Sequence, residues 1–573
     1  MSTTEDHEPW PLRAALLLAL GASLGLLLHW LTGSPDGLLP NDTLRATAAC
    51  LVAVAGLTFA FTLERRRWLW SAAFAFGSGL IVAGIFYWNG GASEWNADEG
   101  WHLAASLLAI AIAAPLFQTL RDGDGRSLEA RPVHDHGWGN LVLWFAAWGF
   151  VVITWLLAHL LAELFQLIGI GLLSDALQQG WFTWMLLSGA LGGAVGLLRD
   201  RDEMLGQIQR VATAVLSVLA PVLALGLLLF VAALPFTGLT SLWDQTRATT
   251  PIILSCIIGS VVLVAAAIGS TPSEEARRRP VRWAAAALCG IMLPLAAVAA
   301  LSTWMRVAQY GYTPERLWAL VAVAVALAFG LAYAAALLRG RRDWPRRVRQ
   351  ANVALALGLV ALALLLATPL INFGAISTRA QLARLQSGAV KPADFDWAAL
   401  AFQFGPEGRA ALARLRQTGS PEIRQAARDA LASENRWEAA EAVRVRGQAR
   451  RLAANVRILP APAPLPESLA LALGGQSVCA AGPCTLFWSP GSAEAVAVGF
   501  GCATCAAEVV RLSQTREGTW ESVDPHQGRD PDAMTAQAGK SQRQAAAAGR
   551  VELRSVTRRQ VYVDGKPVGS AFE

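Results

Sequence analysis

Residues 320–367, LVAVAVALAFGLAYAAALLRGRRDWPRRVRQANVALALGLVALALLLA, decide the fold class of this chain. Two apolar runs rich in Ala, Leu and Val flank residues 339–350, which contain six Arg. Each run, with its neighbouring residues, is close to the roughly 20 residues that a helix needs to cross the hydrocarbon core of a bilayer. Neither run has the polar face of a helix in a water-soluble protein. The stretch therefore predicts two membrane-spanning helices joined by a charged turn.

The chain has the same apolar composition from its first residues to about residue 373. Hydrophobic residues make up 54% of the 573 residues and charged residues only 16%, against about 25% charged residues in soluble domains. Eleven apolar segments reach or approach the length of a membrane span: 12–32, 42–62, 68–88, 100–120, 138–166, 181–198, 209–235, 249–269, 282–303, 316–338 and 351–372. Because the apolar runs are continuous and do not alternate, they exclude a transmembrane β-barrel. We predict an all-α polytopic membrane bundle over residues 1–373.

Arg residues are concentrated in every second connection between these segments. They follow the second, fourth, sixth, eighth and tenth segments, within 65–67, 121–131, 199–210, 277–282 and 339–349. Connections rich in Lys and Arg stay on the cytoplasmic side of a membrane. The N-terminus is therefore predicted to be cytoplasmic, and the residues after 373 to lie on the opposite side. Since the clusters separate apolar runs, they predict the lipid bilayer as partner and no nucleic acid.

Residues 374–573 have the composition of a soluble α+β portion. Residues 374–458 carry apolar positions at helical spacing, which predicts a soluble helical segment. Residues 459–467 form a Pro-rich linker, and 468–573 a small β-rich module with four Cys. Two hairpins are predicted in this module, one from 485–488 and 494–500 and one around Asp564-Gly565. Residues 525–549, rich in Gln, Ala, Gly and Asp, are expected to form a mobile insertion.

Several stretches resemble a family of uncharacterised bacterial membrane proteins, domain of unknown function 4153. They are LFQLIGIGLLSDAL (164–177), WDQTRATTPIILS (243–255), RVAQYGYTPERLWAL (306–320) and the segment 367–415, and YGYTPERLW is the most specific of them. The resemblance covers most of the chain from about residue 130 to the end. It implies a polytopic protein of the bacterial inner membrane with an appended soluble portion, which the predicted topology places in the periplasm. It implies no catalytic or binding residue.

Ionisable residues in or beside a membrane span are the first places to look for function. His159 and Glu163 are four residues apart, so they share one face of a helix. His29 and His102 are at predicted helix ends on the same side of the membrane. If the bundle brings these groups together, they could form a proton relay or a ligand-binding site. The alternative, which we favour, is that each is an interfacial residue near water.

Two further candidates lie in connections between spans. His134-Asp135-His136 has the residue types of a metal chelate, although a solvated loop is the more common setting for them. Arg247 precedes Thr249-Thr250-Pro251, where the hydroxyls and the Pro favour a helix start that could receive an anion. We favour the structural interpretation of both segments, and we predict no metal and no cofactor.

Four cysteines of the β-rich module form a compact set. Cys479, Cys484, Cys502 and Cys505 have the spacing C-x4-C followed by C-x2-C. Outside the inner membrane the surroundings are oxidising, and four cysteines in a small module favour two structural disulfides. Zinc bound by four thiolates and a redox-active Cys502–Cys505 pair are the alternatives. The connectivity stays open, because four cysteines allow three pairings.

The sequence leaves two functional hypotheses from different classes. We favour a transporter or permease-like bundle, because the chain has many predicted spans and Pro within several of them. The alternative is an envelope scaffold or sensor, in which the bundle anchors a periplasmic module that binds other proteins. The corresponding partners are a small solute or periplasmic proteins. No short catalytic motif is recognisable, so the sequence leans away from an enzyme.

Overall fold

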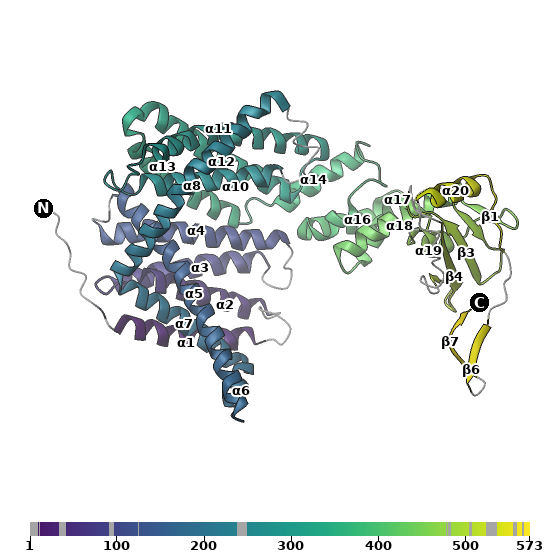
Figure 1. Ribbon diagram of the computed structural model, residues 1–573, viewed down its shortest axis with the longest axis horizontal. Coiled ribbons are helices and arrows are strands. Elements are labelled where there is room, and N and C mark those ends of the chain that lie inside the picture. The colour runs from purple at the N-terminus through teal and green to yellow at the C-terminus, as the bar shows by residue number, and fades with distance from the viewer. Residues whose placement is uncertain are drawn as a thin grey trace. The chain divides into compact units, whose positions relative to one another are not determined.

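The computed structural model describes residues 10, 12–33, 42–90, 97–123, 125, 127–237, 249–476, 478–479, 483–502, 507–522, 536–553, 559–563 and 566–572 (Figure 1). The chain divides into two compact units. The membrane unit is Met1–Gln386 with Gln403–Gly408, and the C-terminal unit is Ser387–Phe402 with Arg409–Glu573. The chain therefore passes from one unit to the other at three points, after residues 386, 402 and 408.

The membrane unit is built from long apolar helices. They are α1 (Leu12–Thr32), α2 (Thr43–Thr62), α3 (Trp68–Trp88), α4 (Ala97–Asp122), α5 (Ala130–Leu167), α6 (Leu172–Gln178), α7 (Gly180–Arg199), α8 (Asp202–Thr237), α10 (Thr249–Ile268), α11 (Arg279–Tyr310), α12 (Pro314–Gly340), α13 (Trp344–Ala367) and α14 (Phe373–Gln386). Ten segments of the described residues are long and apolar enough to cross a membrane. The predicted polytopic α-helical bundle is confirmed.

The tenth of these segments, Pro314–Ala367, contains two of the eleven predicted helices. A 3₁₀ turn, Arg341–Asp343, joins α12 directly to α13. The two helices form a hairpin, in which the buried Tyr333 hydroxyl donates a hydrogen bond of 2.9 Å to Asn352 Oδ1. The sequence therefore predicted both helices, although α13 begins and ends several residues before the predicted segment 351–372.

The helices pack in two groups, which Figure 1 shows on either side of α4. In one group α1, α2, α5 and α7 share a buried cluster around Leu17, Leu143 and Val195. In the other, α8 and α10–α13 share a larger cluster around Leu288, Met292 and Leu295. Helices α1 and α7 approach each other closely, since a Cβ on Gly192 would lie 2.0 Å from the Leu17 carbonyl oxygen. Small residues allow helices to pack closely where the hydrophobic effect offers little driving force between them.

The C-terminal unit joins short helices to a small sheet. Its elements are α15 (Trp397–Phe402), most of α16 (Gly405–Thr418), α17 (Pro421–Ala432), α18 (Arg436–Asn455), β1 (Arg457–Leu459), α19 (Glu467–Gly474), β2 (Thr485–Phe487), β3 (Glu494–Gly499), β4 (Glu508–Gln514), β5 (Trp520–Ser522), α20 (Ala536–Ala547), β6 (Arg559–Val563) and β7 (Lys566–Phe572). The strands are ordered β1-β2-β3-β4-β5, with β1 parallel to β2 and the other pairs antiparallel. The pairs β2–β3 and β6–β7 confirm both predicted hairpins.

One expectation for this unit was wrong in part, and residues 525–535 of the predicted mobile insertion lie outside the described residues. Residues 536–547, within the predicted mobile insertion, form helix α20. Ala is abundant in this segment and has the highest intrinsic helix propensity. Arg543 of α20 lies over the Phe500 ring, 4.5 Å from its centroid, and donates a hydrogen bond to the Cys502 carbonyl. Compositional bias alone did not reveal this tertiary contact.

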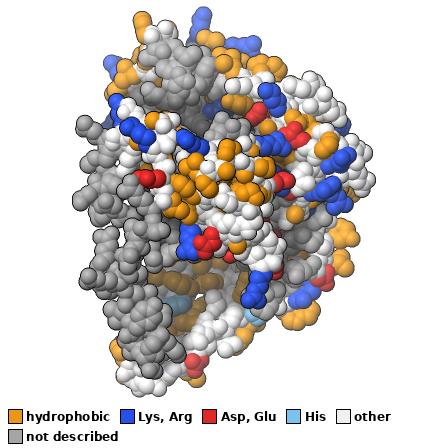
Figure 2. Space-filling model, turned by 90° about the vertical axis from the view of Figure 1, so that its right-hand side faces the viewer, with side chains coloured by type: hydrophobic (Ala, Val, Ile, Leu, Met, Phe, Trp, Pro, Cys, Tyr) orange, Lys and Arg blue, Asp and Glu red, His pale blue; other side chains and the backbone are white. Residues whose placement is uncertain are grey.

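The core of the C-terminal unit lies between the sheet and α19. Leu469 and Leu473 of α19 pack with Leu486 and Leu512 of the sheet, and all four are fully buried. The surface of this unit carries charges of both signs around a central group of apolar side chains, as Figure 2 shows. Such a mixed surface is typical of a unit in contact with water.

Candidate functional site

The Arg-rich connections meet at one end of the membrane unit, which we call the Arg-rich end. Arg13, at the start of α1, contacts Glu64, which follows α2. Arg121, at the end of α4, contacts the last residue of α2, Thr62. Arg349, at the start of α13, contacts Ile268, the last residue of α10. Side-chain contacts thus join helix ends that are far apart in the sequence.

The first polar cluster of this end surrounds the C-terminus of α2. Arg121 is 5% exposed and donates hydrogen bonds to the Thr62 carbonyl and, at 3.0 Å, to Ser71 Oγ. Its Nε lies 2.6 Å from Asp122 Oδ1. Arg199, the last residue of α7, donates to the Phe61 carbonyl. The last carbonyls of a helix have no partner within the helix and carry partial negative charge, so guanidinium groups stabilise this end.

Arg13 closes the same cluster from α1. Its Nη2 lies 3.2 Å from both carboxylate oxygens of Glu64, and its Nη1 donates to the Arg199 carbonyl at 3.3 Å. The planar guanidinium fork suits such bidentate contacts better than an ammonium group does. These buried Arg therefore serve as helix caps, in addition to any effect on topology.

The second polar cluster surrounds the C-terminus of α10. Arg349, 6% exposed, donates to the Ile268 carbonyl at 2.8 Å and pairs with Glu275 at 2.8 Å. In the same connection Ser270 donates from its backbone N and its Oγ to Glu274 Oε2, at 2.9 and 2.8 Å. Partial burial opposes ionisation of Glu274, but these hydrogen bonds outweigh it, and the pKa of Glu274 lies below its ordinary value.

His134-Asp135-His136 lies between the two polar clusters. The segment was predicted in a connecting loop, which is wrong, since it belongs to the first turns of α5. His136 Nε2 lies 3.4 Å from Asp122 in the first cluster. Asp135 and His134 lie near Ser270 and Glu274 of the second cluster, respectively. The three side chains thus lie beside two different clusters, and the described residues hold no group of three or more ligands suited to a metal ion.

His159 and Glu163 lie on the exposed face of α5. The His159 ring packs on Trp155 of the same helix, with ring centroids 4.3 Å apart, and its Nδ1 is 3.0 Å from the Trp155 carbonyl. His29 instead lies beside α7, where a Cβ on Gly180 would be 2.9 Å from its Cε1. Within the described part of the chain, no contact joins any two of the four predicted relay residues His159, Glu163, His29 and His102.

His102 has a structural environment at the opposite end of the bundle. Its Nδ1 is 3.0 Å from the carbonyl of Leu366, in the last turn of α13. Asn89 donates to the carbonyl of the next residue, Ala367, at 3.4 Å. Next to His102, Trp101 stacks on Trp318 of α12 with ring centroids 5.2 Å apart. His102 of α4 and Asn89 at the end of α3 thus hold the end of α13 against these two helices.

The same end carries a docking site for α14 within the membrane unit, which we call the α14 clamp. It consists of Gln381 and Arg384 of α14 and the turn 309–312 between α11 and α12. Gln381 Nε2 donates to the carbonyls of Tyr310 and Tyr312, both at 2.9 Å, and Arg384 donates to the Gln309 carbonyl at 2.8 Å.

The turn of the α14 clamp is shaped for this contact. Gly311 has φ +78°, and a Cβ on it would lie 2.8 Å from Arg384 Cδ and 2.9 Å from Gln381 Nε2. Arg316 supports the turn by donating to the Gly311 carbonyl at 2.9 Å and by lying over the Tyr310 ring. The helix that follows is capped by Thr313, with Pro314 in its first turn. The segment YGYTPERLW (310–318) therefore binds α14 through the carbonyls of its turn.

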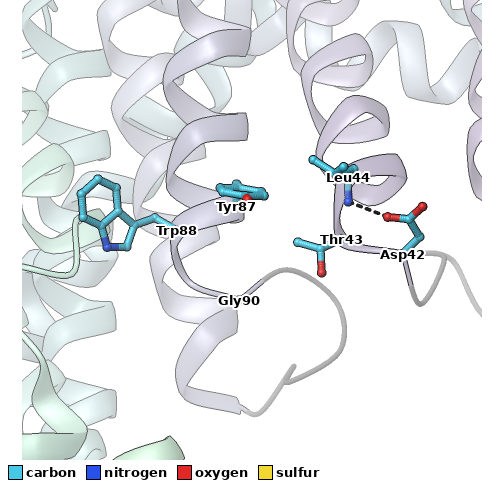
Figure 3. Close-up of a pocket in the computed structure, with 6 residues that line it drawn as sticks. All are labelled: Asp42, Thr43, Leu44, Tyr87, Trp88 and Gly90. Atoms are coloured by element: carbon cyan, nitrogen blue, oxygen red, sulfur yellow. Dashed lines mark hydrogen bonds between the residues drawn. The ribbon is translucent and has the colours of Figure 1, made fainter.

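An open depression lies at the ends of α2 and α3 (Figure 3). It has a volume of about 620 Å³ and is lined by Asp42, Thr43, Leu44, Tyr87, Trp88 and Gly90. Asp42 Oδ1 accepts a hydrogen bond of 2.9 Å from Leu44 N, which is a helix cap. Trp88 and Tyr87 are 75% and 54% exposed, as expected of aromatic residues at a membrane interface. The one carboxylate is thus used by the helix start, and the depression has no converging set of polar groups.

The remaining predicted site residues are the cysteines and Arg247. The structure contains a disulfide between Cys479 and Cys484, both buried in the core of the C-terminal unit. Cys502 is also disulfide-bonded. Cys505 and Arg247 lie outside the described residues. Thr250, next to the predicted anion contact, hydrogen-bonds Thr303 of α11 at 3.2 Å.

Comparison with known families accounts for most of the chain. The family model described as a domain of unknown function, DUF4153, matches residues 47–415. The chain belongs to this family. The match begins earlier than the resemblance seen in the sequence, within α2, and it ends within α16. Neither the comparison with curated proteins nor that with solved structures gives a match.

Both halves of the α14 clamp lie within the family match. Gln381 and Arg384 come from the segment 367–415, and the turn comes from YGYTPERLW, so two stretches that resemble the family contact each other. The sequence pattern alone revealed neither this contact nor the buried Arg caps. The one feature of the sequence that pointed to the clamp was Gly311 between two Tyr residues. A Gly directly before a helix often has a positive φ, and this indicates a tight turn.

Proposed function

We propose that this DUF4153 protein is an envelope scaffold or sensor, in which the membrane bundle anchors a C-terminal module that binds other proteins. The observation that carries the proposal is the α14 clamp. The chain that leaves the last membrane-spanning helix is held by three hydrogen bonds to backbone carbonyls of another connection. A scaffold or a sensor needs such an attachment, because force or conformational change must pass between its parts.

The composition of the C-terminal unit supports protein binding. Helices α17 and α18 are joined by two ion pairs, Arg446 with Asp429 and Arg450 with Glu422. Trp437, at the start of α18, is 84% exposed. Exposed Trp residues are enriched at the centres of protein interfaces. We therefore place the partner surface of the scaffold on this helical part.

Transport, which the sequence favoured, is the competing hypothesis. A relay through His159 and Glu163 needs neighbours for these side chains, and both lie on an exposed helix face. The ionisable groups that the bundle buries, such as Arg121 and Arg349, contact helix ends. Substrate sites of secondary transporters usually lie near the bilayer midplane instead. We therefore favour the scaffold or sensor.

The proposal includes an orientation. We infer from the alternation of Arg that the Arg-rich end faces the cytoplasm and the C-terminal unit the periplasm of a bacterial inner membrane. The disulfide Cys479–Cys484 supports this location, because disulfides persist in oxidising compartments.

Quantitative co-purification tests the proposal. Full-length protein is cross-linked in native membranes and isolated with its partners, in wild type and in the double variant Gln381→Ala/Arg384→Ala. The matched control is Arg379→Ala/Gln386→Ala, which removes the same two residue types from exposed positions of α14. We expect a discrete set of envelope proteins with wild type and control, and its depletion with the clamp variant.

Two results would contradict the scaffold. The first is the same set of partners with the clamp variant as with the control. The second is solute uptake into proteoliposomes that wild type supports and Glu163→Gln abolishes, since that result would favour transport.

A further inference from the structure

Nine Arg residues of two neighbouring connections are exposed at the Arg-rich end. Arg277, Arg278, Arg279 and Arg282 lie between α10 and α11 or at the start of α11, and Arg339, Arg341, Arg342, Arg346 and Arg347 surround the turn between α12 and α13. We call them the basic surface. Within the described part of the chain, none of their guanidinium groups makes an ion pair or a side-chain hydrogen bond. The exposed acidic residues of the same two connections are Glu274 and Asp343.

A buried contact joins the two connections into one surface. Arg349, one turn after Arg346 in α13, reaches the Ile268 and Gly269 carbonyls and Glu275 of the other connection. Its side chain is 6% exposed, so this link is part of the packed interior. The exposed Arg on either side of the link therefore belong to one region of like charge.

The basic surface differs from the first polar cluster in the use of its Arg residues. Arg13, Arg121 and Arg199 donate to helix carbonyls, and their charges are balanced by these carbonyls and by Glu64 and Asp122. The nine Arg of the basic surface have no such internal use. Like charges at short range repel each other, so an external anion would lower the free energy of this arrangement.

Apolar side chains beside the basic surface indicate where that anion comes from. Trp283 follows Arg282 and is 75% exposed, and Leu338 precedes Arg339 and is 78% exposed. Both belong to membrane-spanning helices, in which exposed apolar side chains face lipid and Trp prefers the headgroup layer. In a bilayer, the guanidinium groups next to them would lie at the level of the lipid phosphates.

We propose that the basic surface is a binding site for the headgroups of anionic phospholipids. Arg binds phosphate oxygens through two parallel N–H···O hydrogen bonds, which gives geometric preference as well as charge attraction. Clusters of basic residues directly next to a membrane-spanning helix attract anionic lipids. The site is independent of the proposed scaffold function, since it lies in the membrane unit and uses none of the residues of the α14 clamp.

The test uses full-length protein in micelles and in nanodiscs made of phosphatidylcholine, alone or mixed with phosphatidylglycerol. The basic-surface variant is Arg277→Gln, Arg278→Gln, Arg342→Gln and Arg346→Gln. The matched control is Arg409→Gln, Arg416→Gln, Arg428→Gln and Arg436→Gln, four exposed Arg of the C-terminal unit, with the same change in net charge.

We expect the wild type and the control to retain phosphatidylglycerol over phosphatidylcholine in native mass spectrometry, and to gain thermal stability in the mixed nanodiscs. The basic-surface variant should bind phosphatidylglycerol at least about tenfold more weakly, because each Arg near the surface contributes to the attraction. Its thermal unfolding in pure phosphatidylcholine checks that it is folded.

Three outcomes would overturn the proposal. The first is equal retention of both lipids by the wild type, which can be measured even if the variant does not fold. The second is the same loss of phosphatidylglycerol in the control and the basic-surface variant. The third is full stabilisation by inorganic phosphate without phosphatidylglycerol, which would identify a site for a free anion.

Discussion

Replacement of Gly311 by Ala should release α14 from the membrane unit. Gly311 has φ +78° and ψ −179°, a conformation that is essentially restricted to Gly. An added Cβ would lie 2.8 Å from Arg384 Cδ and 2.9 Å from Gln381 Nε2, so the backbone strain and the clamp side chains oppose it together. The strain costs about 1–3 kcal/mol. The two hydrogen bonds of Gln381 are worth about 0.5–1.5 kcal/mol each.

The expected destabilisation of α14 is therefore about 2–6 kcal/mol. Hydrogen–deuterium exchange of α14 peptides in the full-length protein measures it, since local opening of a segment sets the exchange rates of its amides. Every 1.4 kcal/mol or so corresponds to a tenfold faster exchange. Peptides from α10 and from residues 279–299 of α11 should keep their rates, because the buried cluster that they share does not include the turn.

Gly388→Ala is the matched control for this prediction. Gly388 has φ +75°, close to that of Gly311, but no atom lies within 4 Å of the position of its Cβ. It therefore shows the cost of backbone strain alone, about 1–2 kcal/mol. Equal exchange of α14 in the two variants would refute the clamp, because the contact with Gln381 and Arg384 would then have no energetic effect.

Four other outcomes are expected. Arg121→Gln should destabilise the membrane unit by about 1–3 kcal/mol, because it removes the buried donor to the Thr62 carbonyl and Ser71 Oγ. The exposed Arg67→Gln should have almost no effect in the same thermal unfolding assay. The pKa of Glu274 is lowered in the folded state, so its ionised form stabilises the fold above about pH 4.3, and this contribution is lost as the pH falls through the folded-state pKa. Glu274→Gln should therefore reduce the loss of thermal stability at acidic pH. An unchanged loss would contradict the hydrogen bonds from Ser270. Alkaline phosphatase fused after Gly388 should be active in cells, and an inactive fusion would reverse the proposed orientation. His159→Ala and Glu163→Gln should leave both abundance and function unchanged if these residues are interfacial, whereas loss of function at normal abundance would revive the relay.

The membrane bundle could be predicted almost completely from the sequence. An apolar run of about 20 residues has few ways to satisfy its backbone in lipid other than a helix, so the run itself fixes the element. The predicted spans 68–88 and 249–269, for example, match α3 and α10 to within one residue. The hairpin β2–β3 was equally readable, because a Ser-Pro-Gly-Ser turn separates two short apolar runs.

The candidate site was less predictable, because it depends on which helix ends meet. The sequence pattern placed Arg121 and Arg349 in charged loops. In the structure Arg121 donates to the carbonyl of Thr62, 59 residues away, and Arg349 to that of Ile268, 81 residues away. The position of His136 beside Asp122 depends in the same way on the packing of α5 against α4. Local periodicity contains no information about such contacts between helices.

The buried and the exposed Arg residues of the Arg-rich end therefore need different physical explanations, although both occur in every second connection between the spans. A buried guanidinium group is stable only where carbonyls or carboxylates surround it, as Arg13, Arg121 and Arg349 illustrate. An exposed one, such as Arg278 or Arg342, keeps its charge toward the solvent or the lipid headgroups. The first kind fixes how the helices pack, and the second determines what the surface attracts. Substitution to Gln separates the two, since it should lower the stability of the bundle at the buried positions and lower the affinity for anionic lipid at the exposed ones.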